Sequence, residues 1–240
     1  MSASKPPVVS NLYVMLALLA KDWRLFRAPM VALIVVGAAC YLIALANTLY
    51  PQTDHDALES LFTAAVVSIE LTGLLAAAYG GVAIAGERAD RTADFLGLLP
   101  VSRMQIILSK WMVSLLMIGL CAAFHLLVLG LCLLARSNIH PGNVGPRQVQ
   151  WATALPLWIG FTTSLFGIAW LLSTFLRSGP ISACVSIATT IALFAMVALR
   201  LDAGHYSEQQ VPLVLGSLSL AAGLLSMFGG AIYYLRRIAP

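Results

Sequence analysis

Six long apolar runs constrain this chain more than any other feature of its 240 residues. They cover approximately 30–50, 61–85, 106–135, 152–176, 181–199 and 211–235. A helix needs about 20 apolar residues to cross roughly 30 Å of hydrocarbon, and each run reaches or nearly reaches that length. A lipid-facing backbone must satisfy its own hydrogen bonds, and the runs are far longer than barrel strands. We therefore predict an all-α integral membrane protein with six transmembrane helices.

The amino-acid composition supports the same class. Charged residues make up 10% of the chain and hydrophobic residues 60%, whereas a soluble globular domain carries roughly 25% charged residues. There are too few charges to cover the surface of a soluble protein. The formal net charge of +4 is too small to indicate a nucleic-acid partner. We predict a single transmembrane domain over 1–240 that is surrounded by the lipid bilayer and has no nucleic-acid partner.

The lysines and arginines are divided unevenly between the two ends of the predicted bundle. With six crossings both termini lie on one side, and that side collects Lys5, Lys21, Arg24, Arg27, Arg88, Arg91, Arg103, Lys110, Arg177, Arg236 and Arg237. The other side holds only Arg136, Arg147 and Arg200. The positive-inside rule therefore predicts that both termini are cytoplasmic. We expect a multi-pass protein of the inner (cytoplasmic) membrane of the cell.

The stretch 11–28, which precedes the first run, has a helical pattern of its own. Its large apolar residues recur on one side of a helix, and Lys21 falls on the opposite side. We predict an amphipathic elbow helix that lies flat at the headgroup level, with a break at Pro29 before the first crossing. The alternative is that 12–20 extends the first crossing. The charged residues that would then enter the bilayer, at a few kcal/mol each, are Lys21, Asp22, Arg24 and Arg27.

Charge is concentrated between the second and third runs. The stretch 86–111 carries seven of the 24 charged residues of the chain. Within it, 90–99 has helical character with one apolar side, and Pro100 ends it. Ser102 is placed to cap the next helix, so we expect the third membrane helix to begin near Ser102. The stretch 90–99, within the segment 86–103, is thus predicted to form a short amphipathic helix across the cytoplasmic end of the bundle.

One ordered set of residues runs through this segment: Glu87-Arg88, Thr92, Asp94, Leu96, Leu99-Pro100-Val101-Ser102-Arg103 and Lys110. This order resembles the signature of ABC-2 type transporter permeases, the transmembrane subunits of ABC exporters. The layout of six crossings, an elbow helix and cytoplasmic termini is similar as well. Two positions depart from the family pattern. Ser109 stands where relatives often have glycine, and Asp94 stands where they often have glutamate.

The resemblance implies a permease subunit that works with separate proteins. It implies an ATP-binding cassette subunit that binds ATP and Mg²⁺, and a second permease that is either identical or different. It also implies that 86–103 is the coupling segment of the permease, which docks on the cassette subunit. Carried onto this chain, the coupling residues are the apolar Phe95 and Leu98 together with the charged Glu87, Arg91, Asp94 and Arg103.

The chain has no motif for catalysis or for a bound cofactor. It lacks a GxxxxGK[ST] phosphate loop, so P-loop binding of ATP is expected on another subunit. It also lacks GxSxG, HExxH and paired aspartates. Its four cysteines lie inside apolar runs without metal-binding spacing. We predict no catalytic, cofactor-binding or metal-binding residue and no enzymatic activity in this chain.

Glu70 and His125 are titratable residues predicted near the middle of the second and third crossings. An ionised carboxylate facing lipid costs several kcal/mol, so Glu70 should face the bundle or be protonated. Both residues are candidates for the translocation path, alone or as a pair, and both could instead be structural. They leave open an alternative function, a proton-coupled secondary transporter in which these two residues carry protons. A membrane-anchoring subunit of a larger assembly is a further alternative.

Overall fold

The computed structural model of the chain describes residues 11–49, 57–89, 101–139, 147–203 and 210–237. In these ranges all regular structure is α-helical. The helices are α1 (Asn11–Leu49), α2 (Ala57–Ala89), α4 (Arg103–Ile139), α5 (Arg147–Phe175), α6 (Gly179–Ala203) and α7 (Gln210–Arg237). Each predicted crossing coincides with one of these helices apart from a few residues at its ends, except that α1 begins much earlier.

Five of the described helices are long and apolar enough to cross a membrane. The qualifying stretches are Leu12–Ala44, Arg103–Val128, Leu155–Phe175, Gly179–Leu201 and Gln210–Arg236. The prediction of an all-α, multi-pass membrane protein is therefore confirmed. Helix α2 is also long, at 33 residues, but it is not among these five. Its crossing of the membrane stays a prediction.

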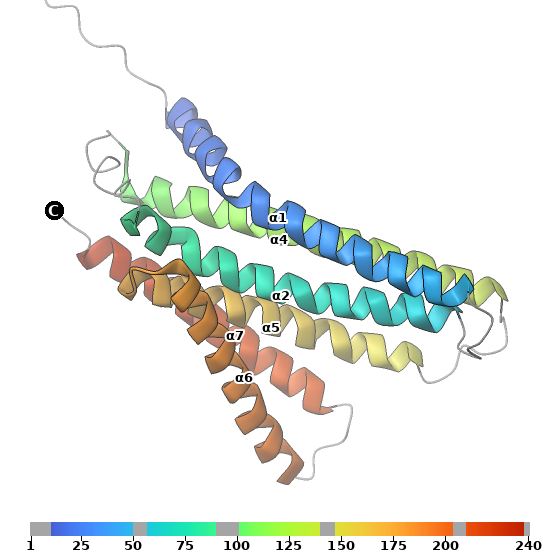
Figure 1. The fold of residues 1–240 in the computed structure, drawn as a ribbon. Helices are drawn as coiled ribbons and strands as arrows, with labels where there is room; N and C mark the ends of the chain where they lie inside the picture. Colours follow the sequence, from blue (N-terminus) through green and yellow to red (C-terminus); the bar gives the residue numbers. More distant parts are fainter. Residues whose placement is uncertain (1–10, 50–56, 90–100, 140–146, 204–209, 238–240) are drawn as a thin grey trace, which may run out of the picture.

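The predicted break between an elbow helix and the first crossing is wrong. Helix α1 runs without interruption over 39 residues, and Pro29 lies inside it. A proline within a helix removes one hydrogen bond and bends the axis, but neighbouring groups can take up the backbone atoms that are freed. The carbonyl that loses its partner here is that of Leu25, four residues before Pro29. Next to it, Tyr79 of α2 donates a hydrogen bond to the carbonyl of Phe26, 2.8 Å away. The N-terminal part of α1 is angled away from the rest of the helix (Figure 1).

The length of α1 also limits the alternative that its beginning simply extends the first crossing. The apolar stretch Leu12–Ala44 has 33 residues, which rise about 50 Å as a helix. The hydrocarbon of a bilayer is only about 30 Å thick. A membrane that holds the C-terminal part of α1 therefore leaves its N-terminal part at or beyond the headgroups.

Helix α2 lies at the centre of the bundle. It packs against α1, α4, α5 and α6, and Figure 1 shows α1 and α4 on one side of it and α5 and α7 on the other. The core around α2 contains the large side chains of Phe26, Tyr79, Met117 and Trp170. Helix α6 leans away from the other helices toward its C-terminal end (Figure 1).

Helices α5 and α7 form the most extensive helix pair, and glycines bring their backbones together. A Cβ atom added at Gly160 would lie 2.1 Å from the carbonyl oxygen of Gly216, and one at Gly167 would lie 2.1 Å from that of Gly223. Both pairs are spaced by seven residues, which is about two helical turns, so the glycines share one face of each helix. Small residues permit such close approach between membrane helices.

Candidate functional site

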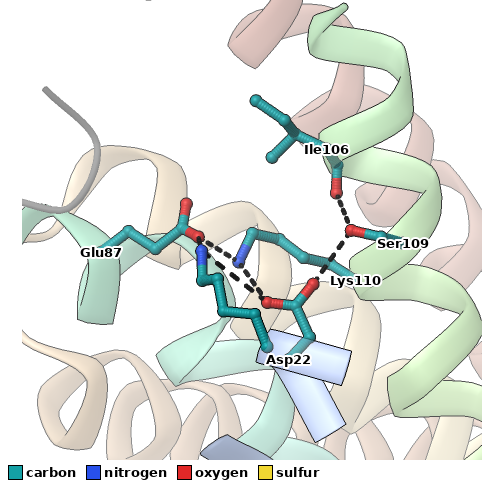
Figure 2. Close-up of polar contacts among 6 residues, drawn as sticks. Asp22, Glu87, Ile106, Ser109 and Lys110 are labelled. Atoms are coloured by element: carbon teal, nitrogen blue, oxygen red, sulfur yellow. Dashed lines mark hydrogen bonds and ion pairs between the residues drawn. The ribbon is translucent and has the colours of Figure 1, made fainter. Parts of the chain in front are cut away.

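A cluster of ionised side chains joins three helices at one end of the bundle. Asp22 comes from α1, Glu87 from α2 and Lys110 from α4, and their side chains converge in Figure 2. Lys110 Nζ lies 2.9 Å from Glu87 Oε1 and 3.6 Å from Asp22 Oδ1. Lys21 of α1 forms a second ion pair with Glu87. We call Lys21, Asp22, Glu87, Ser109 and Lys110 the charged cluster.

The charged cluster is buried and electrically balanced. Asp22, Glu87 and Lys110 are 1%, 4% and 1% exposed, while the side chain of Lys21 is 37% exposed. Removing an ion from water costs several kcal/mol even after the protein relaxes, and only close opposite charges offset that cost. The cluster meets this condition with two positive and two negative groups. Lys21 is the member through which it reaches the surface.

Ser109 adds a hydrogen bond to the charged cluster. Its hydroxyl lies 2.9 Å from Asp22 Oδ2 and 3.0 Å from the carbonyl oxygen of Ile106 on the preceding turn. A hydroxyl carries a single proton, so these two acceptors compete for it. Donation to Asp22 stabilises the ionised carboxylate. A glycine at this position could not make this contact.

The charged cluster stands at both ends of the predicted coupling segment. Glu87 lies in the last turn of α2, and Lys110 lies about two turns into α4. The ion pair between them therefore holds together the two helices that flank this segment, and Asp22 and Lys21 fasten both helices to α1. Of the predicted coupling residues, Glu87 is buried and its ion pairs with Lys21 and Lys110 lie within the chain.

The remaining coupling residues are placed differently. Arg91, Asp94, Phe95 and Leu98 lie outside the described residues. Arg103 is the first residue of α4, and its Nη1 donates a hydrogen bond to the carbonyl oxygen of Leu235 at 3.2 Å. That carbonyl belongs to the last turns of α7, where a cation is favourable. Arg103 therefore ties the beginning of α4 to the end of α7.

The predicted start of the third crossing is confirmed in detail. Helix α4 begins at Arg103, directly after Ser102. The backbone N–H of Gln105 donates to Ser102 Oγ at 3.2 Å, and the backbone N–H of Ser102 donates to Gln105 Oε1 at 2.9 Å. This reciprocal pair is a capping box, which satisfies two backbone donors at the helix start. It fixes the point at which α4 begins.

His125 and Glu70 are not brought together. His125 is fully buried, and its Nδ1 lies 2.9 Å from the hydroxyl of Tyr41 on α1. Its ring packs so closely on α1 that a Cβ added at Gly37 would lie 2.7 Å from Cε1. Within the described part of the chain, His125 Nε2 has no hydrogen-bond partner. Glu70 is exposed on α2. The roles of the two residues in translocation stay predictions.

Sequence reasoning missed part of the charged cluster. Asp22 was placed at the headgroup level with its basic neighbours, and its contact with Lys110 was not foreseen. One signal was present: Asp22 is the single acid among Lys21, Arg24 and Arg27. An isolated acid in a basic, membrane-proximal helix indicates a specific cationic partner. Within the described ranges, no group of three or more His, Cys, Asp or Glu side chains is arranged to hold a metal ion.

Comparison with known proteins adds one match. A family model described as ABC-2 family transporter protein matches residues 46–219. The matched region spans the part of the chain from the end of α1 to the middle of α7, and it includes Glu87, Ser102 and Lys110. No curated protein and no solved structure matches the chain.

Proposed function

Since the chain belongs to the ABC-2 transporter family, we propose that it is the permease subunit of an ATP-binding cassette exporter. It forms the substrate path and couples to a separate ATPase subunit through the segment 86–103. The printed sequence has no GxxxxGK[ST] loop, so the proposal assigns ATP and Mg²⁺ to that partner. The working unit contains two permeases and two cassette subunits, with the substrate exported from the cytoplasm.

The observation that carries the coupling proposal is the position of the charged cluster. Glu87 lies at the beginning of the segment 86–103, and Lys110 lies seven residues after its end. Their side chains are 2.9 Å apart, and Asp22 and Lys21 link them to α1. A displacement of the segment therefore reaches α1, α2 and α4 together. Packed interfaces shift between discrete arrangements and do not stretch. Closure of the cassettes on ATP is thereby converted into a joint movement of three helices.

The predicted coupling residues take two different roles in this proposal. Phe95 and Leu98 seat in the cassette subunit, and Arg91 and Asp94 orient the contact. Glu87 acts as a positioning residue, because its burial at 4% exposure keeps it within the chain. Arg103 is a second positioning residue, which holds the exit of the segment against α7 through Leu235.

The exposure of Glu70 supports the presence of a second permease and of a substrate path between the two permeases. Glu70 lies about midway along α2, and in the single chain its side chain is exposed. An ionised carboxylate that faced lipid at this depth would cost several kcal/mol. A second permease packed over this face, or a hydrated path beside it, removes that cost. His125 lies deeper in the same bundle as a buried polar group on α4.

The test of the proposed function uses the permease co-expressed with its candidate cassette ATPase. Replacing Asp94 and Phe95 together with alanine removes one apolar anchor and one charge from the contact. Because a buried aromatic anchor contributes about 2 kcal/mol or more, we expect co-purification and permease-dependent ATPase activity to fall at least about tenfold. The protein should still insert in the membrane. The matched surface control is Arg200→Ala, in the last turn of α6 and far from the segment 86–103.

Two outcomes would count against this function. Unchanged co-purification and ATPase activity in the double variant would remove the segment 86–103 as the docking site. Transport by the purified chain without any ATPase, driven by a proton gradient, would instead establish the secondary transporter.

A further inference from the structure

A shallow groove lies between the C-terminal ends of α5 and α7. It is lined by Phe175, Gly229, Ile232, Tyr233 and Arg236. The groove is at the same end of the bundle as the charged cluster, because Arg103 at the start of α4 is bonded to Leu235 in α7. One wall is an aromatic pair, in which the rings of Phe175 and Tyr233 lie 4.3 Å apart.

The floor of the groove is a glycine that helix packing does not require. A Cβ added at Gly230 would lie 2.7 Å from Cδ1 of Trp170, so the contact between α5 and α7 needs glycine there. A Cβ added at the neighbouring Gly229 would meet only Cδ1 of Leu171, at 4.0 Å. The protein could therefore carry a side chain at Gly229 without displacing its own atoms. The missing side chain leaves space along the outer face of α7.

The groove combines apolar walls with a cation at one end. Phe175 and Ile232 are each 51% exposed, and Arg236 is exposed at the end of the apolar stretch Gln210–Arg236. From Gly229 to Arg236 the helix rises about 10 Å. The apolar part therefore runs into the membrane from a guanidinium at the headgroup level. Aromatic residues such as Tyr233 are enriched at this depth.

The geometry points to a binding site for an anionic phospholipid in the leaflet at this end of the bundle. The lipid phosphate pairs with Arg236, and an acyl chain follows Ile232 across Gly229 beside the ring of Phe175. A guanidinium binds phosphate through paired donors, and a cytoplasmic leaflet supplies anionic headgroups. A zwitterionic lipid lacks the net charge that Arg236 selects. The bound lipid would brace α7 against the α5 end that leads into α6.

The test compares the purified full-length chain in nanodiscs of phosphatidylcholine with and without phosphatidylglycerol. We expect phosphatidylglycerol to raise the melting temperature and to be retained in native mass spectra. Arg236→Gln, which removes the cation, and Gly229→Leu, which fills the floor, should each lose most of this headgroup-specific shift. The matched controls are Arg24→Gln, at another exposed arginine, and Gly119→Leu, at a glycine with no atom within 4 Å of an added Cβ.

The outcomes distinguish an anionic phospholipid from other occupants of the groove. An equal shift with both lipids in the native chain, or an equal loss in both controls, would overturn the proposal. It would also be overturned if Gly229→Leu changed the oligomeric state while phosphatidylglycerol still stabilised the variant, since the groove would then hold a second copy of the chain. Arg236→Gln leaves the packing of α7 intact and keeps the test decisive if Gly229→Leu fails to fold.

Discussion

Lys110 Nζ on α4 lies 2.9 Å from Glu87 Oε1 on α2, and the side chains of both residues are at most 5% exposed. The pair joins the two helices that lead into and out of the segment 86–103. Asp22 of α1 contacts the same lysine at 3.6 Å. One ammonium group thus contacts carboxylates from two other helices, and Lys21 supplies the second positive charge that balances them. The stability of this end of the bundle depends on keeping these charges balanced.

Lys110→Met should destabilise the protein strongly, because it leaves Asp22 and Glu87 buried without their shared cation. Breaking a buried ion pair from one side costs about 3–5 kcal/mol. Lys21→Met should cost only about 1 kcal/mol or less, since Lys21 is partly exposed and its pairing is screened by water. Unfolding in mild detergent, followed by circular dichroism, measures both. Equal losses for the two lysines would mean that burial does not set the strength of the cluster.

Ser109→Ala should destabilise the protein by about 1–2 kcal/mol, because Asp22 loses a hydrogen bond to its carboxylate. The same substitution should cost less in an Asp22→Asn background, where the acceptor is no longer charged. The double-mutant cycle isolates this coupling from the contact between Ser109 and the Ile106 carbonyl. A coupling energy of zero would mean that Ser109 acts through its contact with the Ile106 carbonyl in α4 and not through Asp22.

Gly160→Ala should separate α5 from α7, because the added methyl group would lie 2.1 Å from the carbonyl oxygen of Gly216. We expect a loss of about 1–3 kcal/mol from overpacking. Gly119→Ala is the matched control. It meets no atom within 4 Å, so it should be neutral or stabilise α4 by about 0.5–1 kcal/mol. A Gly160→Ala protein as stable as the control would contradict the close approach of the two helices.

Cysteine labelling should place Ser102 in the cytoplasm and Arg200 outside. The two residues are exposed, and Arg200 lies about 32 Å along α6 from Gly179, which packs on Gly81 near the charged end. A membrane-impermeant maleimide should label Ser102→Cys only in inside-out vesicles and Arg200→Cys only in right-side-out vesicles. Labelling of the unsubstituted protein measures the background signal from its native cysteines. The reverse pattern would place the segment 86–103 on the wrong side for an ATPase.

Local sequence signals predicted the helices and some of their ends. Apolar runs located the six helices of the described ranges because a backbone in lipid has few alternatives to helix formation. Ser102 predicted the start of α4 because a helix cap involves only neighbouring residues. The reciprocal bond from Gln105 is a further feature that the structure shows.

Contacts between distant residues were harder to predict. The hydrogen bond from Tyr79 to the carbonyl of Phe26, near Pro29 in α1, joins residues that are 53 apart in sequence. The pairing of Asp22 with Lys110 is equally non-local, since the pattern of one helix reveals a charge without revealing its partner.

The glycine contact between α5 and α7 is an intermediate case. The seven-residue interval from Gly160 to Gly167 is repeated from Gly216 to Gly223 and can be read directly from the sequence. The interval alone predicts a small-residue face on each helix. It does not identify which two helices meet, because several other helices also contain glycines. The close backbone approach at Gly160 and Gly216 identifies α5 and α7 as the two helices that meet.

The same glycines restrict where a solute can travel. Between Gly160 and Gly216, and again between Gly167 and Gly223, main-chain atoms of the two helices leave no room even for one added carbon. No molecule can pass between α5 and α7 at these positions unless the two helices separate over two turns. A substrate path between α5 and α7 would therefore require these two helices to separate.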